Sequence, residues 1–162
     1  MMVLQQKEDH PLALLKAAEC QYALHHPRRA KELLETLLSQ RPGILEARFL
    51  YGKILYEHGN YGLSLKQWEL LINHHFEEGV VWFYYGRCLE NTKKYFEALK
   101  AYETFLKQYG SEYAQERWKT WISIIQIWIK VKDYHRGIQY VSEYLAQPAP
   151  DEVKKELLYL KL

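Results

Sequence analysis

Large and small side chains recur along this chain in columns that repeat at one fixed interval, the interval from Ala18 to Gly52 and from Gly52 to Gly86. Two columns hold only large residues: Leu34, Trp68 and Tyr102, and Leu37, Leu71 and Phe105. Two others hold only small residues: Ala18, Gly52 and Gly86, and Ala30, Ser64 and Ala98. A period of this length is typical of repeat architectures, in which each unit buries its apolar face against the next. The pattern therefore predicts three consecutive copies of one helical unit.

The glycine of the third copy lies in an aromatic stretch, WFYYGRCLENTKKYFEALKAY, which runs from Trp82 to Tyr102. A glycine inside a helix costs roughly 1 kcal/mol relative to alanine, so its presence needs a reason. Packed helices lie about 8–10 Å apart, and closer where the side chains between them are small. We expect Gly86 on the first helix and Ala98 on the second to mark the closest crossing of the two helices. Four large residues should pack around this crossing: Trp82, Leu89, Tyr95 and Tyr102.

A fourth copy follows with a longer spacing. The stretch KVKDYHRGIQYVSEYL matches ENTKKYFEALKAYETFL, with Tyr134 in the place of Tyr95 and Gly137 in the place of Ala98. The step from Tyr95 to Tyr134 exceeds the earlier steps by a short insertion around YGSEYAQER, which should lengthen a helix next to that junction. Two prolines then end the repeats, and the remaining residues, 151–162, predict a short capping helix.

These columns resemble the tetratricopeptide repeat (TPR), a helix–turn–helix unit with the pattern W-x2-L-G-x2-Y, then A-x3-F, then P, and with the same period as this chain. The third copy carries the pattern in Trp82, Tyr85, Gly86 and Leu89, followed by Ala98 and Tyr102; the second carries it in Arg48, Tyr51, Gly52 and Leu55, followed by Ser64 and Trp68. The resemblance implies an all-α fold, an α-solenoid of about 3.5–4 TPR-like units with a C-terminal capping helix. We place the units at residues 11–44, 45–78, 79–112 and 118–147, within a single domain over 1–162.

The resemblance also implies a binding surface, because the first helices of such units line a concave groove. At the places that face the groove in this family, the expected partner-binding residues are Phe49, Lys53, Tyr56, Phe83, Arg87, Glu90, Ile122 and Gln126. The fifth and ninth places of the first unit hold Leu15 and Glu19. Lys53 and Arg87 would be neighbours beside two phenylalanine rings, an arrangement that suits a protein or peptide with an acidic group and an apolar anchor. Alternatively, Phe49 and Phe83 only pack against adjacent repeats.

The charge balance argues against nucleic acid as a partner. With 22 basic and 20 acidic residues the net charge is only +2, which leaves no strong electrostatic footprint. The run RRAKELLE alternates in sign at helical spacing and is interpreted as a solvated helix face. No uncharged apolar run approaches the roughly 18–20 residues that span a bilayer, and the start, MMVLQQKEDHPL, lacks the apolar core of a signal peptide. We expect a cytoplasmic protein without membrane insertion.

The residues that could carry chemistry follow no recognisable catalytic or metal-binding motif. Cys20 and Cys88 lie two repeat periods apart and are interpreted as two small buried residues in a reducing compartment. The adjacent histidine pairs at 25–26 and 74–75 lack the i, i+4 spacing of metal ligands on a helix and are interpreted as turn residues at helix ends. We therefore expect no catalytic residues, no cofactor, no bound metal and no enzyme activity.

The leading hypothesis is a non-catalytic interaction module, an adaptor or chaperone-like subunit that binds a peptide or protein segment in its groove. A second hypothesis is a structural subunit that forms homo-oligomers through its aromatic fourth repeat, WKTWISIIQIWIKV, which is apolar nearly all round. If no helix covers this stretch, Trp118, Ile122 and Ile129 would form an exposed patch. A third hypothesis is a regulatory domain of an enzyme.

Overall fold

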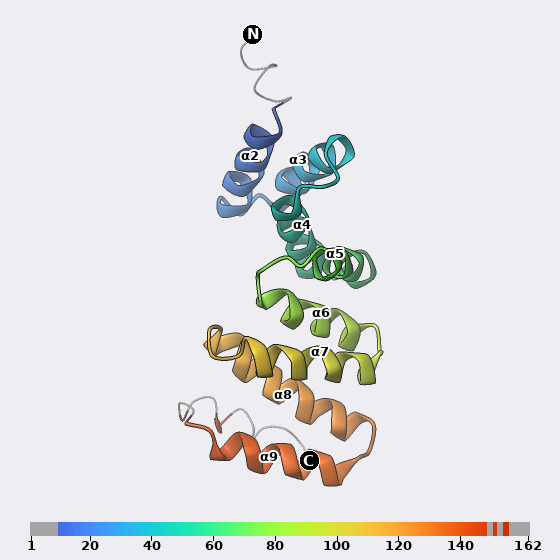
Figure 1. Ribbon diagram of the computed structural model, residues 1–162, viewed down its shortest axis with the longest axis vertical. Helices are drawn as coiled ribbons and strands as arrows, with labels where there is room; N and C mark the ends of the chain where they lie inside the picture. The colour runs from blue at the N-terminus through green and yellow to red at the C-terminus, as the bar shows by residue number, and fades with distance from the viewer. Residues whose placement is uncertain (1–9, 149–150, 152–153, 156–162) are drawn as a thin grey trace. The chain divides into compact units, whose positions relative to one another are not determined.

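The computed structural model describes residues 10–148, 151 and 154–155, and this part of the chain contains eight α-helices and no strand (Figure 1). Consecutive helices pack in pairs as four hairpins: α2 (Pro11–Ala23) with α3 (Pro27–Gln40), α4 (Leu45–Glu57) with α5 (Tyr61–Asn73), α6 (Val80–Asn91) with α7 (Tyr95–Gln108), and α8 (Ala114–Lys130) with α9 (Tyr134–Ala146). The predicted all-α helical-repeat fold is confirmed. The capping helix expected over 151–162 lies largely outside the described residues.

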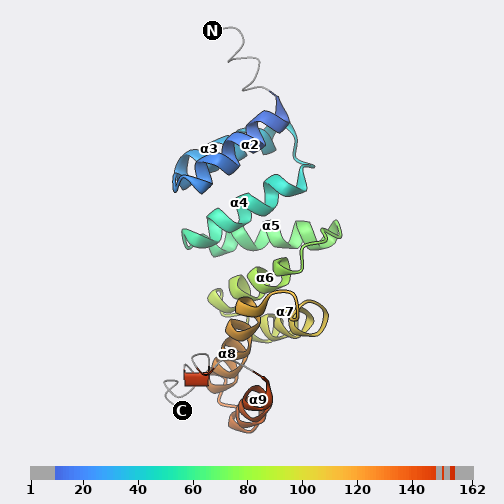
Figure 2. The same ribbon diagram turned by 90° about the vertical axis from the view of Figure 1, so that its left-hand side faces the viewer.

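The chain forms two compact units of two hairpins each, Met1–Glu77 and Glu78–Leu162, here called unit 1 and unit 2. In unit 1, α3 packs on α4 and so joins the two hairpins; Figure 2 shows α4 alongside α5. In unit 2, α8 contacts both α7 and α6. The first helices α6 and α8 of consecutive hairpins are therefore neighbours within that unit.

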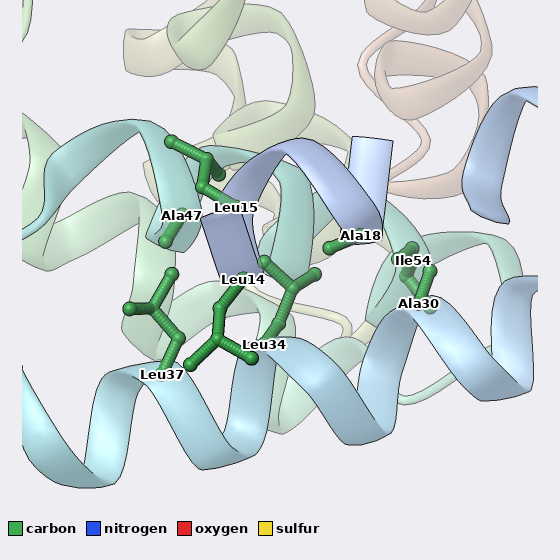
Figure 3. Close-up of a cluster of buried hydrophobic side chains, with 8 residues drawn as sticks. All are labelled: Leu14, Leu15, Ala18, Ala30, Leu34, Leu37, Ala47 and Ile54. Atoms are coloured by element: carbon green, nitrogen blue, oxygen red, sulfur yellow. The ribbon is translucent and has the colours of Figure 1, made fainter. Parts of the chain in front are cut away.

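The core of unit 1 shows why one hairpin is not enough. Eight buried side chains from α2, α3 and α4 form one cluster (Figure 3): Leu14, Leu15, Ala18, Ala30, Leu34, Leu37, Ala47 and Ile54. Two of these residues, Ala47 and Ile54, belong to the second hairpin, and all members except Leu14 and Leu15 are fully buried. Apolar burial contributes about 25 cal/mol per Å², so the two hairpins of unit 1 stabilise each other by covering these side chains.

All four hairpins use the same turn geometry. One residue shortly after each first helix adopts a left-handed conformation, with φ between 60° and 77°: His25, Gly59, Lys93 and Lys132. The next residue's N–H donates to a carbonyl five residues back, as in the 2.8 Å bond from His26 N to Gln21 O. This pattern is the Schellman motif that ends many helices, and it satisfies carbonyls that the helix leaves open.

The repeated glycine place makes room for an aromatic ring of the second helix. A Cβ added at Gly86 would lie 2.5 Å from two ring carbons of Tyr102, and one at Gly52 would lie 2.9 Å from the ring of Trp68. The sequence predicts Tyr102 among the residues packed around Gly86, and its ring fills the space opposite this glycine. Glycine is therefore required by the size of the facing ring.

In the other two hairpins, the places equivalent to Gly86 and Tyr102 hold residues of other sizes. The number of residues between the two places is the same in all four hairpins. In the first hairpin they hold Ala18 and Leu34, both buried in the core of unit 1. In the fourth they hold Ile125 and Val141, which belong to one apolar cluster in unit 2. A larger residue on the first helix thus accompanies a smaller one on the second, as close packing requires.

The predicted insertion lengthens the first helix of the fourth hairpin. Helix α8 has 17 residues, whereas α6 has 12. It begins at Ala114, before the unit boundary expected at Trp118. The longer spacing between the third and fourth copies is therefore taken up as additional helix at this junction.

Candidate functional site

The first helices of unit 1 border a surface cavity of about 640 Å³. Its lining comes from α2 and from the approach to α4: His10, Pro11, Leu12, Leu15, Lys16, Glu19, Arg41, Ile44 and Glu46. Leu15 and Glu19 occupy the fifth and ninth places of the first repeat unit, which the repeat pattern assigns to the groove. The cavity combines an apolar side, from Leu12 and Ile44, with charged groups of both signs.

Three predicted binding residues of unit 1 lie on α4 in different surroundings. The Phe49 ring packs 5.8 Å from the Trp68 ring and 5.6 Å from the Phe76 ring, measured between centroids, so it takes part in packing within unit 1. The Lys53 ammonium lies 5.5 Å from the centroid of the Tyr22 ring on α2, and Tyr56 contacts the Tyr61 ring at 5.7 Å. Lys53 therefore lies where α4 faces α2.

The first helices of unit 2 hold a polar cluster around Glu90, whose side chain is 9% exposed. Its Oε2 accepts a 2.7 Å hydrogen bond from the Tyr102 hydroxyl and lies 3.8 Å from Arg87 Nη1. Lys130 Nζ lies 3.8 Å from Oε1, and Arg87 Nη1 also donates to Ser123 Oγ at 3.0 Å. The cluster joins α6 to α7 and α8.

Burial and the Glu90 carboxylate together determine the protonation of Tyr102 in this cluster. Burial raises the pKa of the Tyr102 phenol well above its ordinary value, and the adjacent Glu90 carboxylate raises it further. The phenol therefore stays protonated and continues to donate to Glu90 at neutral pH. Two cations, Arg87 and the half-exposed Lys130, surround one anion, so the outer edge of the cluster carries net positive charge.

The other predicted residues of unit 2 differ in exposure. Phe83 is 5% exposed and packs 5.9 Å from the Phe105 ring, so it belongs to the interior of this unit. Ile122 is partly buried against the cluster of Trp121, Ile125 and Tyr144, and Gln126 is half-buried on α8. Lys53 belongs to unit 1 and the other basic residue, Arg87, to unit 2, so their adjacency stays a prediction.

The two cysteines do not share one environment. Cys20 is exposed, whereas Cys88 is fully buried. The expectation of two buried cysteines is thus wrong for Cys20. The placement of the histidine pairs at helix ends is confirmed, since residues 25–26 follow α2 and residues 74–75 follow α5.

The described residues can also be considered as metal ligands and as membrane-spanning segments. None of their His, Cys, Asp and Glu side chains gather in a group of three or more that could hold a metal ion. Within the same residues, no helix combines the length and the apolar character that crossing a membrane requires.

Four helical hairpins with one turn geometry and one pattern of volume exchange define a protein of the helical-repeat, or solenoid, class. Family models described as the tetratricopeptide repeat match residues 15–72 and residues 81–111. The chain belongs to the tetratricopeptide repeat family, whose members are modules for protein–protein interaction.

Solved structures with the same fold include several of MamA. One, MamA AMB-1, has a TM-score of 0.77 at 18% identity and covers 94% of this chain and 84% of its own. A second MamA structure has a TM-score of 0.76 at 15% identity, covering 98% and 86%. MamA 41-end from Desulfovibrio magneticus RS-1 has a TM-score of 0.74 at 14% identity, covering 91% and 77%. At these identities the likeness shows the fold alone. A comparison with curated proteins by sequence finds no match.

Proposed function

We propose that this chain is a non-catalytic interaction module that binds a peptide or protein segment along its first helices, α2, α4, α6 and α8. The observation that carries the proposal is the cavity of about 640 Å³ bordered by α2 and the start of α4. It coincides with Leu15 and Glu19, which the repeat pattern places in the groove of the first unit. Concave sites with an apolar wall and a few polar groups are typical binding sites.

The charges of unit 2 favour a partner that has an acidic group, and the cavity of unit 1 adds an apolar contact. In unit 1 the cavity offers Leu12, an exposed apolar side chain, beside charges of both signs, because Lys16 pairs with Glu19 at 2.8 Å and Arg41 shares the lining with Glu46. In unit 2, Arg87 and Lys130 exceed the charge of the one carboxylate between them. A guanidinium binds a carboxylate with two parallel hydrogen bonds, which favours an acidic side chain or a chain terminus.

A selection of displayed random peptides against the full chain tests the proposal. The affinity of the enriched peptides for the wild type is then compared by fluorescence anisotropy with that for the double variant Lys53→Glu/Arg87→Glu. We expect at least a tenfold loss, which corresponds to about 1.4 kcal/mol. The matched control, Lys66→Glu/Lys100→Glu, makes the same charge change at exposed positions of the second helices α5 and α7 and should bind as the wild type does.

Two results would contradict the proposal. One is the absence of any peptide that binds above background. The other is a peptide that loses equal affinity in both double variants, because it would then respond to net charge alone. Since Arg87 contacts the buried Glu90 cluster, the milder variant Arg87→Gln, checked for wild-type circular dichroism, separates a binding defect from misfolding.

One observation favours self-association as a second candidate function. Trp121 and Trp128 of α8 are buried, so these two rings do not form an exposed surface. The exposed apolar side chains at this end lie on α9: Tyr134, Ile138 and Leu145 are 57%, 64% and 49% exposed. Their helical spacing places them on one face, as in a helix that packs against a partner. Sedimentation velocity over a hundredfold concentration range, with Ile138→Lys as the disrupting variant, tests this candidate; a constant monomer mass would exclude it.

A further inference from the structure

Cationic and imidazole side chains surround a second surface cavity of unit 1, about 550 Å³ in volume. Its lining comes from the turn between α2 and α3, from the first turn of α3, and from the residue after α4: His25, His26, Pro27, Arg28, Arg29 and His58. We call this the turn cavity. It shares no lining residue with the cavity between α2 and α4, so it is a separate feature of the surface.

The positive character extends into a smaller adjoining cavity. This space of about 150 Å³ shares Arg28 and His58 with the turn cavity and adds Lys31 and Asn60. No carboxylate is found among the described residues that line these two cavities. A third cavity shares His25 with the turn cavity and contains Glu57, but that carboxylate accepts a 2.5 Å hydrogen bond from the Tyr22 hydroxyl.

The two arginines have no partner within the described part of the chain. Neither guanidinium of Arg28 and Arg29 forms an ion pair or a side-chain hydrogen bond there, and no side chain caps the start of α3. Positive charge in the first turn of a helix is unfavourable, because the helix dipole is itself positive at that end. At the corresponding turn of α9, in contrast, Arg136 pairs with Asp133 at 3.5 Å and lies 4.8 Å from the centroid of the Trp128 ring.

The two histidine pairs of unit 1 provide a comparison within the same chain. Both His25 and His75 have left-handed backbones, with φ of 60° and 53°. The first pair is followed by Pro-Arg-Arg, whereas the second is followed by Phe-Glu-Glu. His58 approaches the turn cavity from another hairpin, and its Nδ1 donates to the Ile54 carbonyl at 2.8 Å, which leaves Nε2 for a further partner. A histidine pair at such a turn therefore does not require arginines beside it, and the two arginines after His25 and His26 need another explanation.

We propose that the turn cavity binds a phosphate group. A dianionic phosphate would satisfy both unpaired guanidinium groups at once, because the planar fork of arginine matches two phosphate oxygens. Its remaining oxygens can accept from the imidazoles, since His58 keeps Nε2 and His26 uses only Nδ1, which lies 3.0 Å from Gln21 Oε1; Lys31 pairs with Glu35 at 3.6 Å and adds charge beside the cavity. A single carboxylate has only two oxygens and one charge, so it would leave part of this donor set unsatisfied. The site is independent of the first-helix faces invoked for peptide binding.

Histidine ring signals in a two-dimensional NMR spectrum report binding directly. The full chain is titrated with inorganic phosphate at constant pH and constant ionic strength, and the signals are assigned with single His→Gln variants. We expect the signals of His25, His26 and His58 to move along one saturating curve. The signals of residues 74 and 75 should stay in place and serve as the internal control.

Two double variants test whether Arg28 and Arg29 are needed for phosphate binding. Arg28→Gln/Arg29→Gln should weaken phosphate binding at least tenfold, whereas Lys66→Gln/Lys100→Gln removes the same charge from exposed positions of α5 and α7 and should leave binding unchanged. Shifts that grow linearly without saturation would overturn the proposal. It would equally be overturned by the same shifts with chloride, or by wild-type affinity in the arginine double variant.

A further titration with peptides shows whether the phosphate belongs to a phosphorylated protein segment or to a small molecule. A phosphoserine peptide is compared with its serine form and with inorganic phosphate in the same titration. Binding of the phosphoserine peptide that is tighter than that of phosphate, with no binding of the serine form, assigns the site to a phosphorylated segment. Equal affinity of peptide and free ion assigns it to small phosphorylated molecules. Equal binding of the serine form would contradict a phosphate site.

Discussion

Replacement of Gly86 by alanine separates two physical effects that act in opposite directions. Gly86 lies inside α6, where alanine is favoured over glycine by about 1 kcal/mol. Helix propensity alone therefore predicts that the variant is more stable than the wild type. The packing around Gly86 predicts the reverse, because the added Cβ would lie 2.5 Å from two carbons of the Tyr102 ring.

The size of the packing effect follows from how firmly that ring is held. Carbon atoms in contact prefer separations of about 3.5–4.0 Å, so the ring would have to move by about 1 Å. Tyr102 is fully buried, and its hydroxyl is fixed by the 2.7 Å hydrogen bond to Glu90. Overpacking of this kind costs about 1–3 kcal/mol. After the propensity gain of about 1 kcal/mol, we expect a net loss of up to about 2 kcal/mol.

Denaturation in urea, followed by circular dichroism in the far ultraviolet, measures the difference in the free energy of unfolding. Gly62→Ala is the control, because an added Cβ there meets no atom within 4 Å, and it should be neutral or stabilising by up to about 1 kcal/mol. Tyr102→Leu should cost less in the Gly86→Ala background than in the wild type, since the first hairpin pairs Ala18 with Leu34. A Gly86→Ala protein that is more stable than the wild type by about 1 kcal/mol, as helix propensity alone predicts, would contradict this packing.

Three further predictions concern single groups. A thiol reagent should label Cys20 in the native protein and Cys88 only after unfolding, so a count of two reactive thiols under native conditions would contradict the burial of Cys88. Asp133→Ala should lower the free energy of unfolding by about 0.5–2 kcal/mol, because its carboxylate caps the start of α9; an unchanged urea midpoint would argue against this cap. Burial raises the pKa of Tyr102 and Tyr140, so the unfolded state ionises first and stability should fall as the pH rises above about 10. Urea midpoints between pH 8 and 11 measure this fall, which Tyr102→Phe should reduce.

The repeat architecture could be predicted from the sequence because size, and not identity, is what packing preserves. The glycine place and the ring place vary together, as in Gly52 with Trp68 and Ile125 with Val141, and their separation along the chain stays fixed. The sequence predicts Tyr102 beside Gly86, whereas the structure shows that the Tyr102 ring itself leaves no room for a Cβ at this place.

Exposure could not be predicted from the place in the repeat. Cys20 and Cys88 are equivalent in the pattern, yet only Cys88 is buried, because α2 is the first described helix and has neighbours on fewer sides. Phe49 and Phe83 likewise occupy places that the family resemblance assigns to the groove, but their rings pack inside their own units. The period fixes which helix carries a residue and leaves open how far neighbouring side chains cover it.

The turn cavity could not be predicted from the sequence for a different reason. The run RRAKELLE alternates in sign, which by itself indicates an ordinary solvated face. Arg28 and Arg29 line one cavity with His58, which follows α4 of the next hairpin. His58 is distant from them in the sequence, so the sequence does not indicate that they are close in space. Folding brings the two turns of unit 1 to one cavity, and only the structure shows this.

We propose that the first helices carry the binding surface, and mapping a bound peptide onto the chain shows whether they do. Backbone amide NMR shifts are recorded for the full protein with and without a peptide obtained by selection. We expect perturbations along α2, α4, α6 and α8, among them the amides around Leu15 and Arg87, with little change in α3, α5 and α7. Perturbations confined to these second helices or to the exposed face of α9 would contradict the claim.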